Sequence, residues 1–478
     1  MSGHSDILVS HVTCDLAIIG GGPAGYVAAI RAAQLGAKVA LVERERVGGV
    51  CLNHGCIPTK TLVESGSLYQ KMRRCGDFGI VSEGEVRVDF SKIMARKDAL
   101  VERLVGTVLE LLKAHRVELI HGEARLLSPG RLQVSRDAAQ LEEVECRRLI
   151  IATGTCPAEP ELDGTALAGV VGSRHLLGVK RQPASLVVIG ASVVGMEFAS
   201  IFHSLGTKVT VLGRSSFLKS IDPQLSRRYR ALCARRGLQV EIGLEFQGIT
   251  PSEDGNLCVR YLAGGKEKHA HGEMVLLAAG CLPLSDGIGL EEAGIRRNDG
   301  GFVQVDEAMR TSAPDVYAAG DVTGGWMLAH VASHEGIVAA ENALGRERTM
   351  DYRAVPNCVY TDPEIASVGM TEADAKQAGI DAAVSRFPLA ASARALTMCA
   401  EEGMVRLVHE RGSGRLLGMH IMAPHASELI AEGAVAIRAG LTASDLAETL
   451  HQHPTLSETL MEAAMAAANG EAIHFRHV

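Results

Sequence analysis

The sequence predicts an α/β fold with two Rossmann-like dinucleotide-binding domains, the second inserted in the first, and a C-terminal α+β domain. Two glycine-rich turns, residues 20–25 and 190–195, each follow a short apolar run and precede a helical pattern. After Arg353 the pattern changes to alternating strands and two helices, which is typical of an antiparallel sheet with packed helices. The length of 478 residues is sufficient for about three domains.

The first glycine-rich turn lies in a strand–turn–helix–strand unit. Residues 15–19 form a short apolar strand, residues 26–35 follow a helical pattern, and residues 38–42 form the next strand. With the acid Glu43 about 20 residues after the turn, the pattern is a strong dinucleotide signature, and Glu43 would accept hydrogen bonds from a ribose. The glycines that serve the tight turn, the approach of the pyrophosphate and the helix–strand packing are Gly20, Gly22 and Gly25.

The second turn begins a unit of the same kind but departs from the first. Its outer glycines are Gly190 and Gly195, whereas Ser192 replaces the middle glycine and Gly213 holds the position that corresponds to Glu43. Arg214 follows directly, and Lys219 lies in the same segment. A missing acid beside available cations favours a ribose 2′-phosphate, and therefore NADP over NAD. The alternative is that both cations are ordinary solvated surface charges.

Two dinucleotide units in one chain imply two dinucleotides, one bound electron carrier and one exchangeable partner. Residues 150–154 form a strand that leaves the first domain, and residues 275–280 form the strand that returns to it. A further strand ends in Asp321, whose carboxylate could bind a ribityl or ribose hydroxyl. The predicted domains are a first dinucleotide-binding domain in two parts (1–152 and 281–352), a second one (153–280) and a C-terminal domain (353–478). We also expect a helix over 89–116, strands over 358–361, 404–408 and 416–422, and helices over 426–439 and 457–468.

Cys51 and Cys56 lie shortly after the first turn and indicate redox chemistry. A disulfide between them closes a very small ring, which stabilises the fold little because chain-entropy stabilisation grows with loop length. Reactivity is the better explanation, since a thiolate at a helix start near Lys60 would have a depressed pKa. The alternatives are two unrelated buried cysteines or half of a zinc site, but no second matched ligand pair is present.

The composition, 47% hydrophobic and 22% charged, is that of an ordinary globular chain. A formal net charge of −8 argues mildly against nucleic acid as a main partner. No apolar run of about 18 residues predicts a membrane span, and residues 1–13 lack the features of a secretory signal or a mitochondrial presequence. Scattered single cysteines suit a reducing compartment, here the cytoplasm, and these are Cys14, Cys75, Cys146, Cys156, Cys233, Cys258, Cys281, Cys358 and Cys399.

With these motifs the chain resembles the flavin-dependent pyridine nucleotide-disulfide oxidoreductases, and within that family the dihydrolipoamide dehydrogenases, from about Cys14 to Ala468. The resemblance implies FAD and NADP or NAD as the dinucleotides, and a homodimer that the C-terminal domain forms. The segments that carry it are residues 48–60 (redox-active disulfide), 152–154 and 319–321 (flavin contacts), 327–330, and 451–458 (C-terminal acid/base motif).

The resemblance also implies a role for each site residue. Cys56 would lie next to the flavin and Cys51 would face the substrate sulfur, while Lys60 would lie near the flavin, paired with Glu197. The implied FAD contacts are Gly20, Gly22, Gly25, Glu43, Gly49, Lys60, Gly122, Thr153, Gly154, Asp321 and Ala329. The implied NAD(P) contacts are Gly190, Ser192, Gly195, Glu197, Arg214, Lys219 and Gly280.

His453, oriented by Glu458, would be the general acid/base and would act on the disulfide of the partner subunit. A histidine can supply and remove the proton that thiol–disulfide exchange needs near pH 7. A carboxylate such as Glu458 fixes the tautomer and stabilises the imidazolium. His451, two residues earlier, is interpreted as structural, and His330 is given no catalytic role.

The implied activity passes electrons between dihydrolipoamide, the Cys51–Cys56 disulfide, FAD and NAD(P), with free lipoamide or a lipoyl-carrying protein as substrate. Two alternatives stay open: an NADPH-dependent reductase of another disulfide or of a metal ion, similar to mercuric reductase, and a non-catalytic subunit of a lipoyl-carrier complex. Residues 463–478 contain no cysteine pair of the mercuric reductase kind, which argues against mercury. Two departures from the family pattern are Cys281, where an arginine is usual, and Asp362, where a histidine is common.

Overall fold

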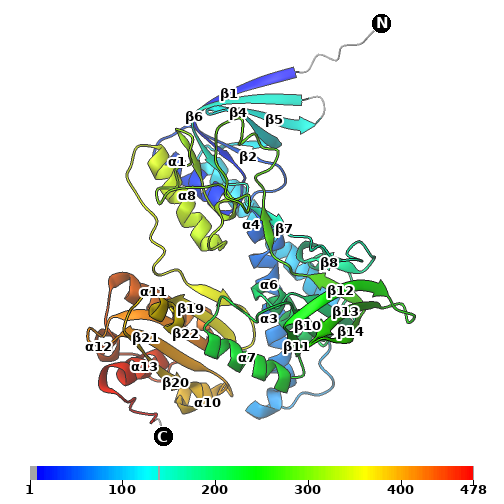
Figure 1. Cartoon of the computed structure of the whole chain (residues 1–478), viewed down its shortest axis with the longest axis vertical. Helices are drawn as coiled ribbons and strands as arrows, with labels where there is room; N and C mark the ends of the chain where they lie inside the picture. Colours follow the sequence, from blue (N-terminus) through cyan, green and yellow to red (C-terminus); the bar gives the residue numbers. More distant parts are fainter. Residues whose placement is uncertain (1–7, 138–139, 477–478) are drawn as a thin grey trace. The chain divides into compact units, whose positions relative to one another are not determined.

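The computed structural model describes residues 8–137 and 140–476, so the prediction about a targeting sequence in residues 1–13 lies partly outside the described residues. The chain divides into two compact units (Figure 1). The first unit contains residues 1–61, 92–158 and 279–350, and the second contains residues 62–91, 159–278 and 351–478. Among the helices of the described residues, none has the length and apolar character that crossing a membrane requires.

A seven-stranded sheet forms the first unit, with the strand order β3-β2-β1-β6-β5-β4 and β17 paired to β6. The strands β1, β2, β3, β6 and β17 pair in parallel, whereas β4 and β5 form an antiparallel extension of β6. The strands are β1 (Leu8–Ile19), β2 (Val39–Glu43), β3 (Glu118–His121), β4 (Glu123–Ser128), β5 (Arg131–Asp137), β6 (Gln140–Ile151) and β17 (Val316–Ala318). A separate ribbon pairs β7 (Thr155–Pro157) with β16 (Cys281–Pro283).

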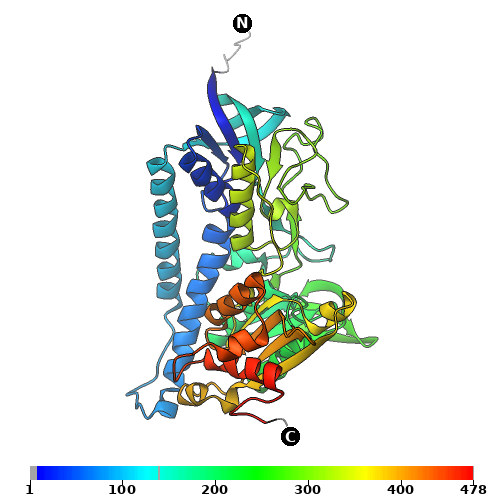
Figure 2. The ribbon, with the colours of Figure 1, turned by 90° about the vertical axis from the view of Figure 1, so that its left-hand side faces the viewer.

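The helices α1 (Pro23–Gln34) and α8 (Ala329–Ala343) lie side by side in the first unit (Figures 1 and 2). Small residues permit this close packing, because a Cβ atom at Gly336 of α8 would overlap the carbonyl oxygen of Ala24 in α1. The long helix α4 (Phe90–Ala114) adds buried apolar side chains at helical spacing, Val101, Val105, Val108 and Leu112. This apolar layer holds the start of α1 against the end of β1.

The second unit contains a parallel sheet with the strand order β11-β10-β9-β15-β8. Its strands are β8 (Val170–Gly172), β9 (Ser185–Ile189), β10 (Lys208–Gly213), β11 (Gln239–Ile242) and β15 (Met274–Leu277). The helix α6 (Val193–Ser204) connects β9 to β10, and α7 (Pro223–Arg235) connects β10 to β11. An antiparallel meander, β12 (Leu244–Pro251), β13 (Leu257–Ala263) and β14 (Lys266–Gly272), precedes β15.

An antiparallel sheet with the order β18-β19-β22-β21-β20 forms the C-terminal part of the second unit. Its strands are β18 (Asn357–Val359), β19 (Glu364–Gly369), β20 (Ala382–Pro388), β21 (Met404–Glu410) and β22 (Leu416–Ala423). The helices α11 (Ala426–Ala439), α12 (Ala443–Glu448) and α13 (Glu458–Asn469) pack on this sheet and bury a shared apolar core. The predicted α+β pattern is therefore confirmed.

The remaining elements are short, apart from α3. They are the helices α2 (Gly49–His54), α3 (Cys56–Arg73), α5 (Ser173–Leu176), α9 (Glu372–Gln377) and α10 (Ala393–Thr397), with the 3-10 turns Cys75–Phe78, Asp321–Thr323 and Leu389–Ala391.

The strand predicted over residues 150–154 begins earlier and ends at Ile151. The strand cannot extend to Gly154, because that residue has a left-handed backbone, with φ at +73°. The strand predicted over residues 15–19 also begins earlier, since Leu8–Ile19 pairs along the whole of β6.

Candidate redox site

The turn between β1 and α1 presents backbone groups rather than side chains. Gly20 has φ at +100°, and a Cβ atom there would overlap the carbonyl oxygen of Ala152. Gly22 begins α1 without a side-chain cap, so the first backbone N–H groups of the helix are left for a ligand. A Cβ atom at Gly22 would meet only the Cα of Gly49, at 3.8 Å, so no protein atom demands glycine there. The space that a side chain would fill suits a pyrophosphate.

Glu43 is fixed at the end of β2 by backbone donors. Its Oε2 accepts the N–H of Gly21 and its Oε1 accepts the N–H of Glu45, each at 2.6 Å. A Cβ atom at Gly21 would lie 3.0 Å from the same Oε2, so glycine makes room for this carboxylate. The N–H of Gly122 donates to the backbone oxygen of Glu43 at 3.0 Å, which brings two predicted residues together. The carboxylate keeps lone pairs for ribose hydroxyls.

The segments around Thr153 and Asp321 also fit FAD. The Oγ1 of Thr153 is buried and has no hydrogen-bond partner among the described residues, as expected for a hydroxyl that serves a ligand. Asp321 follows β17, accepts a hydrogen bond from Thr155 Oγ1 at 3.3 Å, and has a pKa that burial raises. Ala329 begins α8, whose N-terminus lacks a side-chain cap, and the space around Gly154 is open.

Cys51 and Cys56 lie on consecutive helices, Cys51 within α2 and Cys56 as the first residue of α3. Both are free thiols, and they are hydrogen-bonded to each other. The hydrogen bond to Cys56 and then burial raise the pKa of Cys51, and the charge of Lys60 only partly opposes this. The expectation of a depressed pKa is therefore wrong for Cys51 in the dithiol form. Lys60 lies one helical turn after Cys56 on α3.

Asn53, between the two cysteines, is a residue that the sequence analysis missed. Its Nδ2 donates to the backbone oxygens of Val47 (3.1 Å) and Gly49 (2.9 Å), which holds the loop before α2. Its Oδ1 is buried without a partner among the described residues. Its position within residues 48–60 is the only sequence signal that could have indicated it.

The second turn, in the second unit, repeats the backbone of the first. Gly190 has φ at +125° and lies against the carbonyl oxygen of Ala278. Ser192 begins α6 but its hydroxyl makes no capping hydrogen bond, so the helix N-terminus is again left for a ligand. Arg214 and Lys219 are exposed and form no ion pair among the described residues. Both cations are therefore accessible to a phosphate.

Glu197 is buried in α6, where its Oε1 accepts the N–H of Tyr360 at 3.0 Å. Lys60 belongs to the first unit and Glu197 to the second, so their pairing stays a prediction. Gly280, in the first unit, has φ at +114°, and a Cβ atom added there would meet no described atom within 4 Å.

His453 and Glu458 form a hydrogen-bonded pair in the second unit, with Nδ1 and Oε1 at 2.8 Å. The Oε2 of Glu458 accepts the N–H of Thr455 at 2.8 Å, so both carboxylate oxygens are held. Burial alone would raise the pKa of Glu458, but the Thr455 N–H and the His453 ring outweigh burial and lower it. His453 Nε2 is left to exchange a proton, because the side chain is 74% exposed.

His451 differs from His453 in its surroundings. Its side chain is 5% exposed, its Nε2 lies 2.8 Å from Glu432 Oε1, and its Nδ1 lies 2.8 Å from the backbone oxygen of Thr449. Both ring nitrogens are therefore occupied, which supports the interpretation of His451 as structural.

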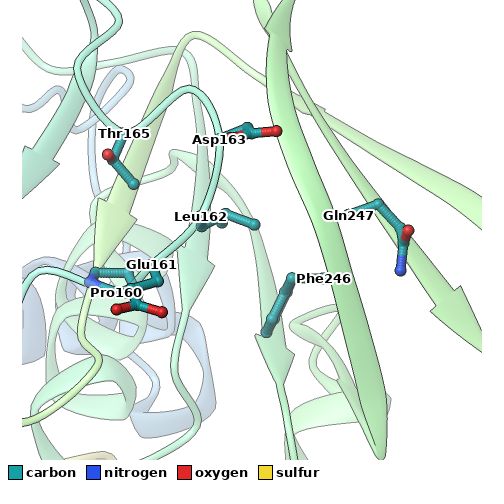
Figure 3. Close-up of a pocket in the computed structure, with 7 residues that line it drawn as sticks. All are labelled: Pro160, Glu161, Leu162, Asp163, Thr165, Phe246 and Gln247. Carbon is teal, nitrogen blue, oxygen red and sulfur yellow. The ribbon is translucent and has the colours of Figure 1, made fainter.

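A pocket of about 470 Å³ lies beside β12, lined by Pro160, Glu161, Leu162, Asp163, Thr165, Phe246 and Gln247 (Figure 3). Figure 3 shows the carboxylates of Glu161 and Asp163 pointing in different directions. None of the predicted site residues lines this pocket. Over residues 8–137 and 140–476, no group of three or more His, Cys, Asp or Glu side chains is placed to hold a metal ion.

Comparison with protein families gives two matches that cover most of the chain. Residues 14–336 match the model of the pyridine nucleotide-disulphide oxidoreductases, and residues 355–464 match the dimerisation domain of the same family. The chain belongs to the pyridine nucleotide-disulphide oxidoreductase family. Membership confirms the predicted fold class, FAD with a nicotinamide dinucleotide as the cofactors, and the homodimer.

Relatives in this family are similar along nearly the whole chain. The dihydrolipoyl dehydrogenase of Thermus scotoductus is 42% identical over 97% of this chain and 99% of its own length. That of Geobacillus stearothermophilus is 41% identical over 96% of both chains. The mitochondrial dihydrolipoyl dehydrogenase of Sus scrofa is 36% identical over 97% of this chain and 92% of its own.

Solved structures of the same family share the fold. LpdA of Mycobacterium tuberculosis superimposes with a TM-score of 0.87 at 30% identity, over 94% of this chain and 99% of that chain. The HOCl-induced flavoprotein disulfide reductase RclA of Escherichia coli superimposes with a TM-score of 0.83 at 29% identity, over 94% of this chain and 99% of that chain.

Proposed function

We propose that the chain is a dihydrolipoyl dehydrogenase that moves electrons between dihydrolipoamide and NAD(P) by way of the Cys51–Cys56 pair. The observation that carries the proposal is the His453–Glu458 pair, because thiol–disulfide exchange with an organic dithiol needs a placed proton acceptor. The 36–42% identity to dihydrolipoyl dehydrogenases, along nearly the full chain, supports the same substrate.

The two cysteines carry the sulfur chemistry. One substrate thiolate attacks Cys51 of the disulfide, a mixed disulfide forms, and Cys56 leaves as the thiolate. The second substrate thiolate then attacks the mixed disulfide, which releases oxidised lipoamide and leaves two reduced cysteines. Two electrons and two protons have then left the substrate. FAD, held by the first glycine-rich turn and Glu43, would supply the two-electron link between the reduced cysteines and NAD(P)+.

His453 accepts the proton of the substrate thiol. Because Glu458 Oε1 holds Nδ1, the Nδ1 proton stays on the carboxylate side and Nε2 is the atom that accepts a proton from the substrate. The anionic Glu458 stabilises the resulting imidazolium. We infer that His453 acts on the cysteine pair of the partner subunit.

We propose FAD contacts through Gly20, Gly22, Gly25, Glu43, Gly49, Lys60, Gly122, Thr153, Gly154, Asp321 and Ala329. We propose NAD(P) contacts through Gly190, Ser192, Gly195, Glu197, Arg214, Lys219 and Gly280. The open glycine positions and the orphaned Thr153 hydroxyl support the first set. We also propose that residues 1–152 and 281–352 form the FAD-binding domain, that 153–280 form the NAD(P)-binding domain, and that 353–478 form the dimerisation domain. A cytoplasmic location is supported by the free cysteines of the described residues.

Steady-state lipoamide reduction with NADH and NADPH, measured side by side, tests the proposal. We expect turnover with both, in ping-pong kinetics, and its complete loss in Cys56→Ser. Glu458→Gln should slow lipoamide turnover by roughly 100-fold, the size of a general acid/base contribution, and leave flavin reduction by NADPH nearly unchanged. Equal losses in both half-reactions would contradict the role of Glu458.

An NADPH-dependent reductase of another disulfide or of a metal ion is a second candidate, favoured by Gly213 and the accessible Arg214. Glutathione disulfide and Hg²⁺ distinguish the two candidates. Turnover of either that exceeds lipoamide turnover at equal concentration would replace the first proposal.

A further inference from the structure

The segment between β10 and α7, residues 214–222, carries Arg214 and Lys219, and we call it the cation loop. Its exposed parts are residues 214–216 and 219–220, and its buried parts are residues 217–218 and 221–222. Both cations therefore belong to exposed parts that alternate with buried ones. The contacts of the buried parts decide where the cations are held.

The middle of the cation loop is fixed on two sides. The N–H of Leu218 donates to the backbone oxygen of Ala191, in the second glycine-rich turn, at 3.0 Å. The backbone oxygen of Phe217 accepts the hydroxyl of Ser226, in α7, at 2.7 Å, and the Phe217 ring stacks on that of Tyr229 with centroids 6.1 Å apart. Leu218 has φ at +45°, a left-handed conformation that a leucine keeps only where its surroundings impose it. The cation loop is therefore held between the turn and α7.

Asp222 is the last residue of the cation loop and begins α7. Its Oδ1 accepts the N–H of Gln224 at 2.9 Å and that of Leu225 at 3.1 Å, which caps the helix. The side chain is only 2% exposed. A carboxylate so far from water requires a partner of opposite charge.

That partner is Arg406 of β21, in the C-terminal sheet. Its side chain is 3% exposed, and its Nε lies 3.3 Å from Asp222 Oδ1, an ion pair without the alignment of a hydrogen bond. Its Nη1 donates to Oε1 of Gln224. Glu372 lies 3.7 Å from Nη2 but is 65% exposed. His420 is opposite Arg406 in the sheet, and burial lowers its pKa, so its ring stays neutral. The buried charge of Arg406 is therefore matched mainly by Asp222.

We propose that Arg406 is a positioning residue for the ribose 2′-phosphate of NADP: through Asp222 it fixes the end of the cation loop and so presents Arg214 and Lys219 to the phosphate. This inference rests on the proposed contacts of those two cations. A loop that is ordered on folding loses no further conformational entropy on binding, which raises affinity. A ribose without the phosphate makes no use of the cations, so Arg406 affects NADPH selectively.

Asp222→Asn tests the proposal, because the amide oxygen can still cap α7 while the charge that faces Arg406 is lost. Calorimetry of the full-length FAD-loaded dimer measures the Kd of adenosine 2′,5′-bisphosphate, which carries the phosphate, and of 5′-AMP, which lacks it. We expect the first Kd to rise about tenfold, through loss of a preorganised charged contact. The Kd of 5′-AMP should stay within about twofold of wild type, since it does not depend on that contact. The KM values for NADPH and NADH should differ in the same way.

The double variant D222N/R406M separates positioning from stability. Replacing both members of a buried ion pair is often neutral for stability, so the melting temperature should return toward that of wild type. The affinity for the bisphosphate should stay low, because the cation loop is still not fixed to β21. Glu372→Gln is the matched control: it removes the other carboxylate beside Arg406, which lies outside the cation loop, and should change neither affinity.

Equal bisphosphate affinity in wild type and D222N would overturn the inference, as would equal losses for the bisphosphate and 5′-AMP or an equal loss in E372Q. Recovery of the affinity in D222N/R406M would show that Arg406 only stabilises the fold, and would also overturn it. Hydrogen exchange of residues 214–222 without nucleotide should be faster in D222N than in wild type. Unchanged exchange, together with a loss of affinity in Arg214→Ala, would overturn this inference alone. Unchanged affinity in Arg214→Ala would instead refute the proposed phosphate contact and this inference with it.

Discussion

The turns at residues 20–25 and 190–195 use glycine for the same backbone reasons. Gly20 and Gly190 are both left-handed, and each lies against a carbonyl oxygen of a neighbouring strand end, at Ala152 and Ala278. The last glycine of each turn packs against the carbonyl oxygen of the first. The two turns differ in the side chains that face the ribose of the dinucleotide.

In the first turn Gly21 leaves room for the Glu43 carboxylate, whose Oε2 would lie 3.0 Å from a Cβ at that position. In the second turn the glycine and the larger residue have changed places. Ala191 stands where the first turn has Gly21, and Gly213 stands where it has Glu43. A Cβ at Gly213 would lie 2.9 Å from the Cβ of Ala191. A side chain at position 213 would therefore require Ala191 or its backbone to shift. Ala191 thus disfavours a side chain at position 213, and Arg214 is the first charged residue after β10.

The largest expected effect comes from replacing the first glycine of each turn, because each turn should bind a different dinucleotide. Gly20→Ala should weaken FAD binding by roughly 100-fold, because a left-handed alanine and its overlap with a carbonyl oxygen each cost about 1–2 kcal/mol. Gly190→Ala should keep the flavin and lose its reduction by NADPH. The measurements are flavin absorbance per protein chain and bleaching by NADPH. Loss of flavin in Gly190→Ala with normal melting temperature would contradict the assignment of ligands to the two turns.

Most of this comparison could be predicted from the sequence, because glycine spacing reports backbone conformation directly. The role of Ala191 could not be predicted, because it depends on the distance to Gly213 at the end of the neighbouring strand β10. The raised pKa of Cys51 was missed for a similar reason: burial and the Cys56 contact are tertiary properties.

Glu43→Gln should weaken FAD binding by about tenfold, because a charged hydrogen bond to the ribose is lost while the amide oxygen can still accept the Gly21 N–H. Fluorescence titration of the apoprotein with FAD measures this. Glu45→Gln is the control, because Glu45 contributes its backbone N–H and not its carboxylate to this network. Comparable weakening in both variants would mean that general charge, rather than the fixed Glu43 carboxylate, holds the ribose.

Gly213→Glu alone should not create a preference for NADH, because the new side chain meets Ala191 Cβ. The double variant A191G/G213E recreates the Gly21–Glu43 arrangement and should lower the KM for NADH by about fivefold, the value of one hydrogen bond. Arg214→Ala should raise the KM for NADPH by about tenfold through loss of a charged contact to phosphate, with little change for NADH. Steady-state KM values for both nucleotides are the readout. A gain of NADH affinity in G213E alone, equal to that of the double variant, would disprove the coupling of the two positions.

The smallest effect concerns Asp321, a half-buried acid for which we identify no counterpart in the second turn. Burial raises its pKa, so the protonated carboxyl is favoured by folding and the ionised carboxylate costs stability above the raised pKa. Asp321→Asn should therefore raise the melting temperature of the apoprotein at pH 8 by roughly 1 °C, the shift expected for about 1 kcal/mol in a chain of this length, while FAD binds more weakly. The stability gain should shrink as pH falls through the raised pKa, because wild-type Asp321 then becomes neutral as well. Asp315→Asn, at an exposed ion pair with Arg148, is the control and should change little. Calorimetry of the apoprotein across pH checks this, and a pH-independent difference between Asp321→Asn and wild type would mean that the substitution acts through packing and not through the buried charge.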